Sequence, residues 1–190
     1  INVTYEKSCI TIETPNITAT PICAGSTATL TLNNKQDGVT YTLGGTPIFT
    51  DGTTHTVNPD RTTTYTITAT STNSCDANQE ETANVTVTVN AIPTLSPSVT
   101  VNSICEGETK TITVNTNATS IKWYKNETLI EDQTTASLSI TTAGTYKVVV
   151  SNASGCSKEM SFPVANAFGS DITPTITGSA SVQSGATNIT

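Results

Sequence analysis

The sequence predicts an all-β protein made of tandem sandwich domains, and its composition and patterning are the first evidence. Threonine supplies close to a quarter of the residues, and with Val and Ile it makes nearly every candidate strand rich in β-branched side chains. Apolar and polar residues alternate over short runs separated by turn sequences such as Asp37-Gly38 and Gly44-Gly45. No window shows the periodicity of an amphipathic helix. We therefore expect strands throughout the chain.

The length and the net charge of the chain limit the number of domains and the classes of binding partner that we expect. The chain has 190 residues, of which 35% are apolar and 5% aromatic, so two small domains with thin cores are expected and each needs a covalent staple. The net charge is −7, with 8 basic and 15 acidic residues and no basic cluster. This balance excludes nucleic acid and anionic membrane surfaces as partners. No apolar run is long enough for membrane insertion as a helix.

The stretch from Ile121 to Cys156 has the strand order typical of an immunoglobulin-like β-sandwich. Trp123 lies in a short alternating strand and needs a thick core beneath its ring. Gly144, two residues before Tyr146, is typical of the tyrosine corner at the start of strand F. The alternative interpretation is an antiparallel β domain of another kind.

An internal repeat predicts that this pattern occurs twice. Cys23-Ala-Gly-Ser-Thr opens one unit and Cys105-Glu-Gly-Glu-Thr opens the next, and the spacings to the closing Cys75 and Cys156 differ by one residue. A Tyr stands ten residues before each closing Cys. In the first unit, Tyr takes the position that Trp has in the second. The predicted core aromatic residues are Trp123, Tyr146, Tyr41 and Tyr65.

The repeat sets the expected domain organisation. Residues 15–92 and 93–166 are predicted to be two immunoglobulin-like domains, 1–14 the last strands of a preceding domain, and 167–190 a linker with the first strands of a following one. Asp51-Gly52 is the strongest single hairpin signal. The expected strands are Ala28–Leu32, Thr40–Leu43, His55–Val57, Thr64–Ala69 and Ala83–Val89 in the first unit, and Thr109–Val114 and Met160–Val164 in the second.

The five cysteines favour disulfides over a metal site, because none has the C-x-x-C spacing. Disulfides in turn indicate an oxidising compartment. We expect Cys23–Cys75 and Cys105–Cys156, each tying the start of its own domain to the turn after strand F at one pole of the sandwich. Each bond is worth roughly 3 to 4 kcal/mol by loop closure. Cys9 would then be unpaired in this fragment.

Catalytic chemistry has no candidate residues. The chain has one histidine, His55, on an expected strand among threonines, and it lacks a phosphate-binding loop, a carboxylate pair and a metal cluster. We expect no enzyme activity, no catalytic or cofactor-binding residue and no metal site. Calcium is the only ion left open, because acidic residues lie in expected turns, namely Asp37, Asp51, Asp60, Asp76, Glu80 and Glu81.

Several motifs together carry a resemblance to a known group. They are Cys-x-Gly-x-Thr at the start of each unit, the Trp-Tyr strand, Gly-Thr-Tyr-x-Val-x-Val with a terminal Gly-Cys, and Pro-Thr-Ile-Thr-Gly at 174–178. The chain resembles the tandem Ig-like and PKD-like repeats of Bacteroidota cell-surface proteins, which include gliding-motility adhesins and other type IX secreted proteins. The resemblance implies a secreted protein at the cell surface. Tyr41 in place of Trp, and Gln183 in place of Cys, depart from the pattern.

Three functions are consistent with these features. The first is a structural or adhesive segment of a long extracellular filament or adhesin stalk, whose partners are neighbouring repeats or copies of the same protein. In one version, residues 1–14 and 167–190 of successive copies pair into a composite domain. The second is a module that binds surface glycans or proteins through Trp123, Tyr124 and Tyr41. The third is a passive spacer on a secreted enzyme.

Overall fold

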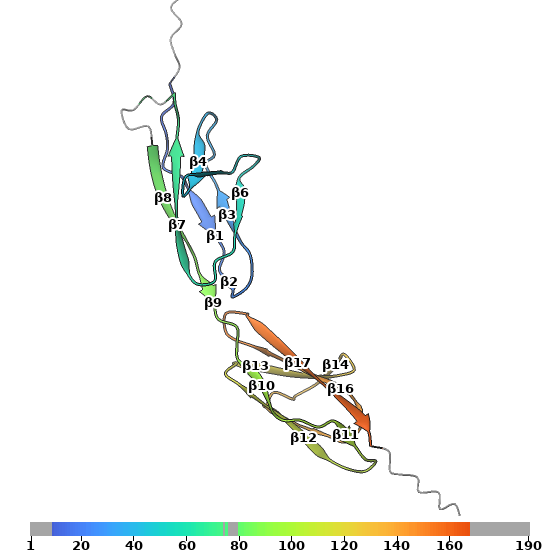
Figure 1. Ribbon diagram of the computed structural model, residues 1–190. Helices are drawn as coiled ribbons and strands as arrows, with labels where there is room; N and C mark the ends of the chain where they lie inside the picture. Colours follow the sequence, from blue (N-terminus) through green and yellow to red (C-terminus); the bar gives the residue numbers. More distant parts are fainter. Residues whose placement is uncertain (1–8, 74, 76–79, 168–190) are drawn as a thin grey trace, which may run out of the picture.

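The computed structural model describes residues 9–73, 75 and 80–167, and it shows two β-sandwiches arranged in file (Figure 1). Every regular element in these residues is a strand. Accordingly, the described part of the chain contains no helix long and apolar enough to span a membrane. The first sandwich ends near residue 90 and the second begins a few residues later, so the connection between them is short.

The first sandwich packs a three-stranded sheet against a four-stranded one. The sequence alternates along β3 so that Ala28, Leu30 and Leu32 are buried, as a half-buried strand requires. The small sheet has the order β1 (Ile17–Ala19), β3 (Ala28–Leu32), β6 (Thr54–Val57). The larger has the order β5 (Thr46–Ile48), β4 (Thr40–Leu43), β7 (Thr63–Thr70), β8 (Glu80–Val87). A separate parallel pair, β2 (Ile22–Cys23) with β9 (Val89–Asn90), lies at the end that faces the second sandwich.

The second sandwich repeats this plan, except that its parallel pair is part of the larger sheet. Its small sheet has the order β10 (Leu95–Val99), β12 (Lys110–Thr116), β15 (Ser137–Ile140). Its larger sheet has the order β11 (Ser103–Ile104), β17 (Ser157–Asn166), β16 (Gly144–Ser151), β13 (Ser120–Lys125), β14 (Thr128–Ile130). Strand β11 pairs in parallel with the end of β17, just as β2 pairs with β9. The predicted fold class, all-β with tandem immunoglobulin-like sandwiches, is confirmed.

Each sandwich has its own hydrophobic core, and three of the four predicted aromatic residues are buried in them. Trp123 is 0% exposed, and its Nε1 donates a hydrogen bond to the Thr135 carbonyl at 2.9 Å. Tyr146 is buried and its hydroxyl donates to the Thr142 carbonyl at 2.8 Å, which is the predicted tyrosine corner. Tyr41 is buried in the first core, and burial raises the pKa of its phenol. Tyr65 is only partly buried and packs against that core.

Two short edge strands, β5 and β14, were not among the expected strands. Each follows a two-residue turn in which both residues have positive φ, Gly44-Gly45 at 56° and 82° and Asn126-Glu127 at 48° and 65°. Positive φ at both central positions is the type I′ hairpin geometry. The hairpin predicted at Asp51-Gly52 is wrong. These residues connect β5 to β6, which belong to different sheets.

The segment before the first sandwich differs from the prediction in its described part. Residues 1–8 lie outside the described residues, but Ile12 is buried in the first core. The Ile10 amide donates to the Asn73 carbonyl at 2.8 Å, and the Cys75 amide donates to the Ile10 carbonyl at 2.9 Å. Residues 9–12 therefore pack on the first sandwich and do not belong to a preceding one. Of the segment 167–190, only Ala167 is described.

Candidate interdomain junction

The disulfides differ from the predicted pairs. Cys9 bonds to Cys75, and Cys23 bonds to Cys156 with a Cα–Cα distance of 5.6 Å. Cys105 is free and exposed. The predicted pairs Cys23–Cys75 and Cys105–Cys156 are therefore wrong, as is the expectation that Cys9 is unpaired. One disulfide lies within the first sandwich and the other joins the two sandwiches.

The direction of the strands explains the error. Strands β7 and β8 are antiparallel, with Thr70 opposite Glu80 at one end of the sheet. Cys75 lies in the connection at that end, whereas Cys23 is paired with Asn90 beyond the opposite end. Ten strand residues separate the two ends by roughly 33 Å, whereas disulfide Cα atoms lie within about 7 Å of each other. A Cys before β3 and a Cys after β7 are thus at opposite poles of one sandwich.

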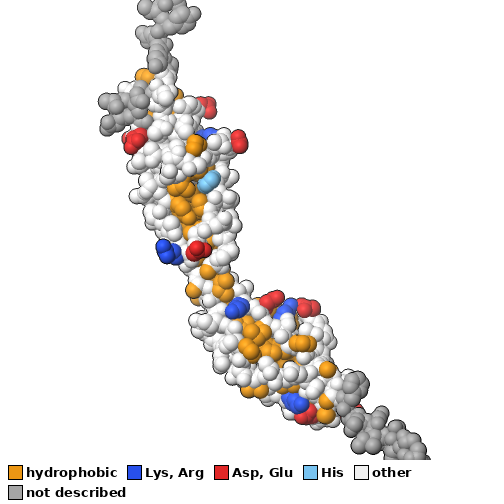
Figure 2. Space-filling model, in the orientation of Figure 1, with side chains coloured by type: hydrophobic (Ala, Val, Ile, Leu, Met, Phe, Trp, Pro, Cys, Tyr) orange, Lys and Arg blue, Asp and Glu red, His pale blue; other side chains and the backbone are white. Residues whose placement is uncertain are grey.

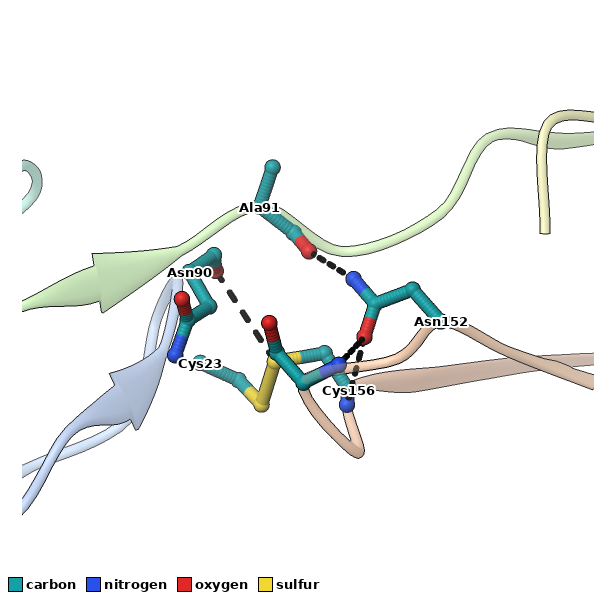
Figure 3. Close-up of a disulfide and its surroundings, with 6 residues drawn as sticks. Cys23, Asn90, Ala91, Asn152 and Cys156 are labelled. Atoms are coloured by element: carbon teal, nitrogen blue, oxygen red, sulfur yellow. Dashed lines mark hydrogen bonds between the residues drawn. A yellow bond between two sulfur atoms is a disulfide. The ribbon is translucent and has the colours of Figure 1, made fainter. Parts of the chain in front are cut away.

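Cys23 is placed at the junction by the parallel pair β2–β9. The Ile22 amide donates to the Thr88 carbonyl and the Ala24 amide to the Asn90 carbonyl, both at 2.9 Å. These bonds hold the Cys23 backbone against the strand by which the chain leaves the first sandwich. The turn of the second sandwich that carries Cys156 approaches the same point (Figure 3).

Asn152 organises the turn that presents Cys156. Its Oδ1 accepts hydrogen bonds from the Ser154 amide at 3.1 Å and the Cys156 amide at 3.0 Å. Gly155 has a φ of 81°, which favours glycine at this position. The Nδ2 of Asn152 reaches across the junction and donates to the Ala91 carbonyl at 2.7 Å (Figure 3). Cys156 is 1% exposed, and its Sγ lies 3.9 Å from the Asn90 carbonyl oxygen.

The linker between the sandwiches is short and anchored at both ends. Four residues, 91–94, separate β9 from β10. The Val89 amide donates to Thr62 Oγ1 at 3.0 Å on the first side. On the second side, the Thr94 amide donates to Asn117 Oδ1 at 2.8 Å, and Pro93 is buried. The two sandwiches thus have two covalent connections, the backbone and the disulfide, and two connections restrict bending far more than one.

The other candidate sites carry no comparable arrangement. His55 is partly buried and makes an edge contact with Phe49, with ring centroids 6.3 Å apart. Among the described residues, no group of three or more His, Cys, Asp or Glu side chains is placed to hold a metal ion, and Asp76 lies outside them. On the face shown in Figure 2, acidic and basic side chains are scattered over both sandwiches.

The aromatic residues proposed for sugar binding do not form a platform. Trp123 and Tyr41 are 0% and 2% exposed, so neither ring presents a face to solvent. Tyr124 is partly exposed, but the Lys147 ammonium lies 5.4 Å from its ring centroid. That ammonium is paired with Glu127, and the hydrogen bond between them raises the pKa of Lys147.

The two packed sheets of each sandwich and the disulfide-linked junction define a tandem array of immunoglobulin-like domains.

Comparison with protein families identifies the array more closely. The family described as "Ig-like domain CHU_C associated" matches twice, over residues 13–90 and 91–166. The chain therefore belongs to this family, in two tandem copies. No curated protein matches the chain.

Solved structures of tandem immunoglobulin domains are similar to the chain at low identity. Titin domains I67–I69, in an E-to-A variant, are 16% identical, with 82% of this chain and 66% of that chain covered and a TM-score of 0.38. Sidekick-1 domains 1–5 are 18% identical, covering 86% and 40%, with a TM-score of 0.39. The tandem Ig repeats of Dlar are 17% identical, covering 82% and 96%, with a TM-score of 0.36. The chain thus spans two thirds or less of the titin and Sidekick-1 chains.

Proposed function

We propose that this chain is a load-bearing segment of a long extracellular stalk or filament, built from immunoglobulin-like domains that are stapled end to end. It acts by length and stiffness and has no enzymatic role. Binding to surface glycans or proteins belongs to other parts of such an assembly. Its direct partners are the neighbouring repeats.

The observation that carries this proposal is the Cys23–Cys156 disulfide between the sandwiches. A domain that only needs stability gains most from a bond within itself, as Cys9–Cys75 provides for the first sandwich. A bond between domains instead fixes their relative orientation. The bond also stabilises the first sandwich against unfolding. While the second sandwich stays folded, unfolding of the first leaves residues 23–91 as a closed loop, and this loss of chain entropy adds roughly 4 kcal/mol to its unfolding free energy.

The same bonds support a location at the cell surface. Two disulfides in a chain with thin cores are typical of an oxidising, extracellular setting. The resemblance to repeats of Bacteroidota gliding-motility adhesins and other type IX secreted proteins supports an adhesin stalk in particular. A passive spacer on a secreted enzyme would use the same rigid file, and the flanking sequence distinguishes these two uses.

Small-angle scattering combined with residual dipolar couplings tests the proposal. In the oxidised chain, both sandwiches should fit one alignment tensor, and the scattering should be that of an elongated particle. In C23S/C156S, the two tensors should separate as the junction loosens. The control is C9S/C75S, which also loses one disulfide but keeps the junction, and it should retain a single tensor. A compact particle, or identical couplings in all three proteins, would contradict the proposal.

A further inference from the structure

Cys105 occupies the same structural position in the second sandwich as Cys23 does in the first. Both cysteines directly end or follow a two-residue strand that pairs in parallel with the strand leaving the sandwich, β2 with β9 and β11 with β17. Both begin a tight turn with a glycine of positive φ, 80° at Gly25 and 76° at Gly107. The two turns are closed by equivalent backbone bonds, from Ser26 to Cys23 at 3.0 Å and from Glu108 to Cys105 at 3.2 Å.

The Cys105 turn is additionally held in place by Glu108. The Glu108 carboxylate accepts a hydrogen bond from the Cys105 amide at 3.0 Å and is paired with Lys110 at 3.3 Å. The bond from the Cys105 amide lowers the pKa of the Glu108 carboxyl. The turn is therefore ordered before any partner binds, as the Cys23 turn is in its bonded state.

The two positions also differ in what covers them. Cys23 is covered by the turn that carries Cys156. Cys105 is exposed beside an open hollow of about 620 Å³, which is lined by its own turn together with Thr141, Thr142 and Ala167. The hollow lies at the end of the second sandwich where the chain leaves it, as the junction lies at that end of the first.

We propose that Cys105 is the first half of a second interdomain disulfide, made with the cysteine in the turn between the last two strands of a further immunoglobulin-like sandwich in the array. The inference rests on the proposed stalk function and names the partner at the end of the second sandwich that carries the exposed Cys105. Two thiols join by losing two electrons and two protons, which a disulfide oxidant of the thiol-exchange type takes up as it is reduced to two thiols. The resulting junction repeats that of Cys23 and Cys156.

A second copy of this chain does not offer the required thiol. Its two equivalent turn cysteines, Cys75 and Cys156, are already bonded to Cys9 and Cys23. Among the cysteines of an oxidised copy, only Cys105 remains free. The occupant is therefore a further sandwich whose turn cysteine has no partner of its own.

An extended chain tests this directly. Residues 1–167 are followed by a second copy of 91–166, which places the added sandwich after Ala167 as the second follows Asn90. The change Lys158→Arg in the added copy makes its Cys156 peptide distinct in mass. Non-reducing digestion after alkylation should find the Cys105 of residues 1–167 joined to the added Cys156, with the original Cys23–Cys156 bond retained and the Cys105 of the added copy alkylated. With Cys105→Ser in residues 1–167 alone, the added Cys156 should be alkylated.

Two results would overturn the inference. One is alkylation of the Cys105 that belongs to residues 1–167 of the extended chain, and the other is a dimer joined through that same cysteine. A second measurement uses the 190-residue chain and a peptide of residues 150–158, activated as the thionitrobenzoate mixed disulfide. Cys105 should displace thionitrobenzoate from this peptide several-fold faster than from a scrambled peptide, and equal rates would count against recognition of the turn. These results do not depend on the stiffness of the Cys23–Cys156 junction, so the two proposals fail separately.

Discussion

The Nδ2 of Asn152, in the second sandwich, donates a 2.7 Å hydrogen bond to the carbonyl of Ala91, in the linker from the first. The same side chain shapes the turn that presents Cys156, because its Oδ1 accepts from the Ser154 and Cys156 amides. One residue thus holds both the disulfide and the linker at the junction. Its amide group provides both an acceptor for the turn and a donor for the linker. Other side chains of this size provide this combination only in part.

Two substitutions separate these functions of Asn152. Asn152→Ala removes all three bonds and should destabilise the second sandwich by about 1 to 3 kcal/mol. Asn152→Asp keeps an acceptor for the turn but loses the donor to Ala91. It should therefore leave the turn amides protected from hydrogen exchange while the linker loosens. If Asn152→Asp exposed the turn amides as much as Asn152→Ala does, the assignment would be wrong.

The disulfides also predict how far the chain extends under load. When residues 9 and 167 are pulled apart, the force passes from Cys23 to Cys156 through their disulfide. Only residues 10–22 and 157–167 can then be extended, which gives at most about 90 Å of unfolded chain. The C23S/C156S variant should yield about 330 Å and the fully reduced chain about 570 Å. Single-molecule force spectroscopy with handles that do not use thiols measures these lengths. If the oxidised chain instead had the pairs Cys23–Cys75 and Cys105–Cys156, one within each sandwich, the extended length would be about 200 Å.

The tyrosine corner provides a stability prediction in the second sandwich. Tyr146→Phe removes the 2.8 Å bond to the Thr142 carbonyl and should cost about 1 kcal/mol of unfolding free energy. Tyr124→Phe is the matched control, because that ring is partly exposed and lies under Lys147. Its expected effect is within about 0.5 kcal/mol of zero. Urea unfolding of both variants, followed by tryptophan fluorescence, gives the comparison.

The burial of Trp123 predicts its response to quenchers. The chain has one Trp, which is 0% exposed, so native fluorescence should be blue-shifted and insensitive to iodide. Quenching should appear only after unfolding. Strong quenching of the folded chain would mean that the indole faces solvent, and the sugar-binding alternative would then regain its aromatic platform.

Local patterns in the sequence predicted most strands and three of the four proposed core aromatic residues correctly. The bounds Ala28–Leu32 and Thr40–Leu43 match β3 and β4, because alternation with β-branched residues is a short-range signal. The Gly144 and Tyr146 spacing likewise predicted the tyrosine corner. Strand β14 was missed because its turn uses Asn126 and Glu127 at positive φ, and Glu is an uncommon residue there.

The junction was out of reach of the same reasoning, although one signal was present. The repeat identified Cys23 as the opening cysteine and Cys75 as the closing cysteine of one unit. A spacing along the sequence, however, carries no information on which end of the sandwich each cysteine occupies. The strand directions do: β3 and β7 lie in different sheets but run the same way (Figure 1), so the start of β3 and the end of β7 are far apart. Applied to the expected strands, this rule separates the opening cysteine of each unit from the closing cysteine of the same unit.

Non-reducing peptide mapping of the intact oxidised chain tests the central claim most directly. Alkylation of free thiols, digestion and mass spectrometry should find Cys23 joined to Cys156, Cys9 joined to Cys75 and Cys105 alkylated. A Cys23–Cys75 or Cys105–Cys156 peptide as the main product would mean that each sandwich is closed on itself, and the stapled junction would not exist.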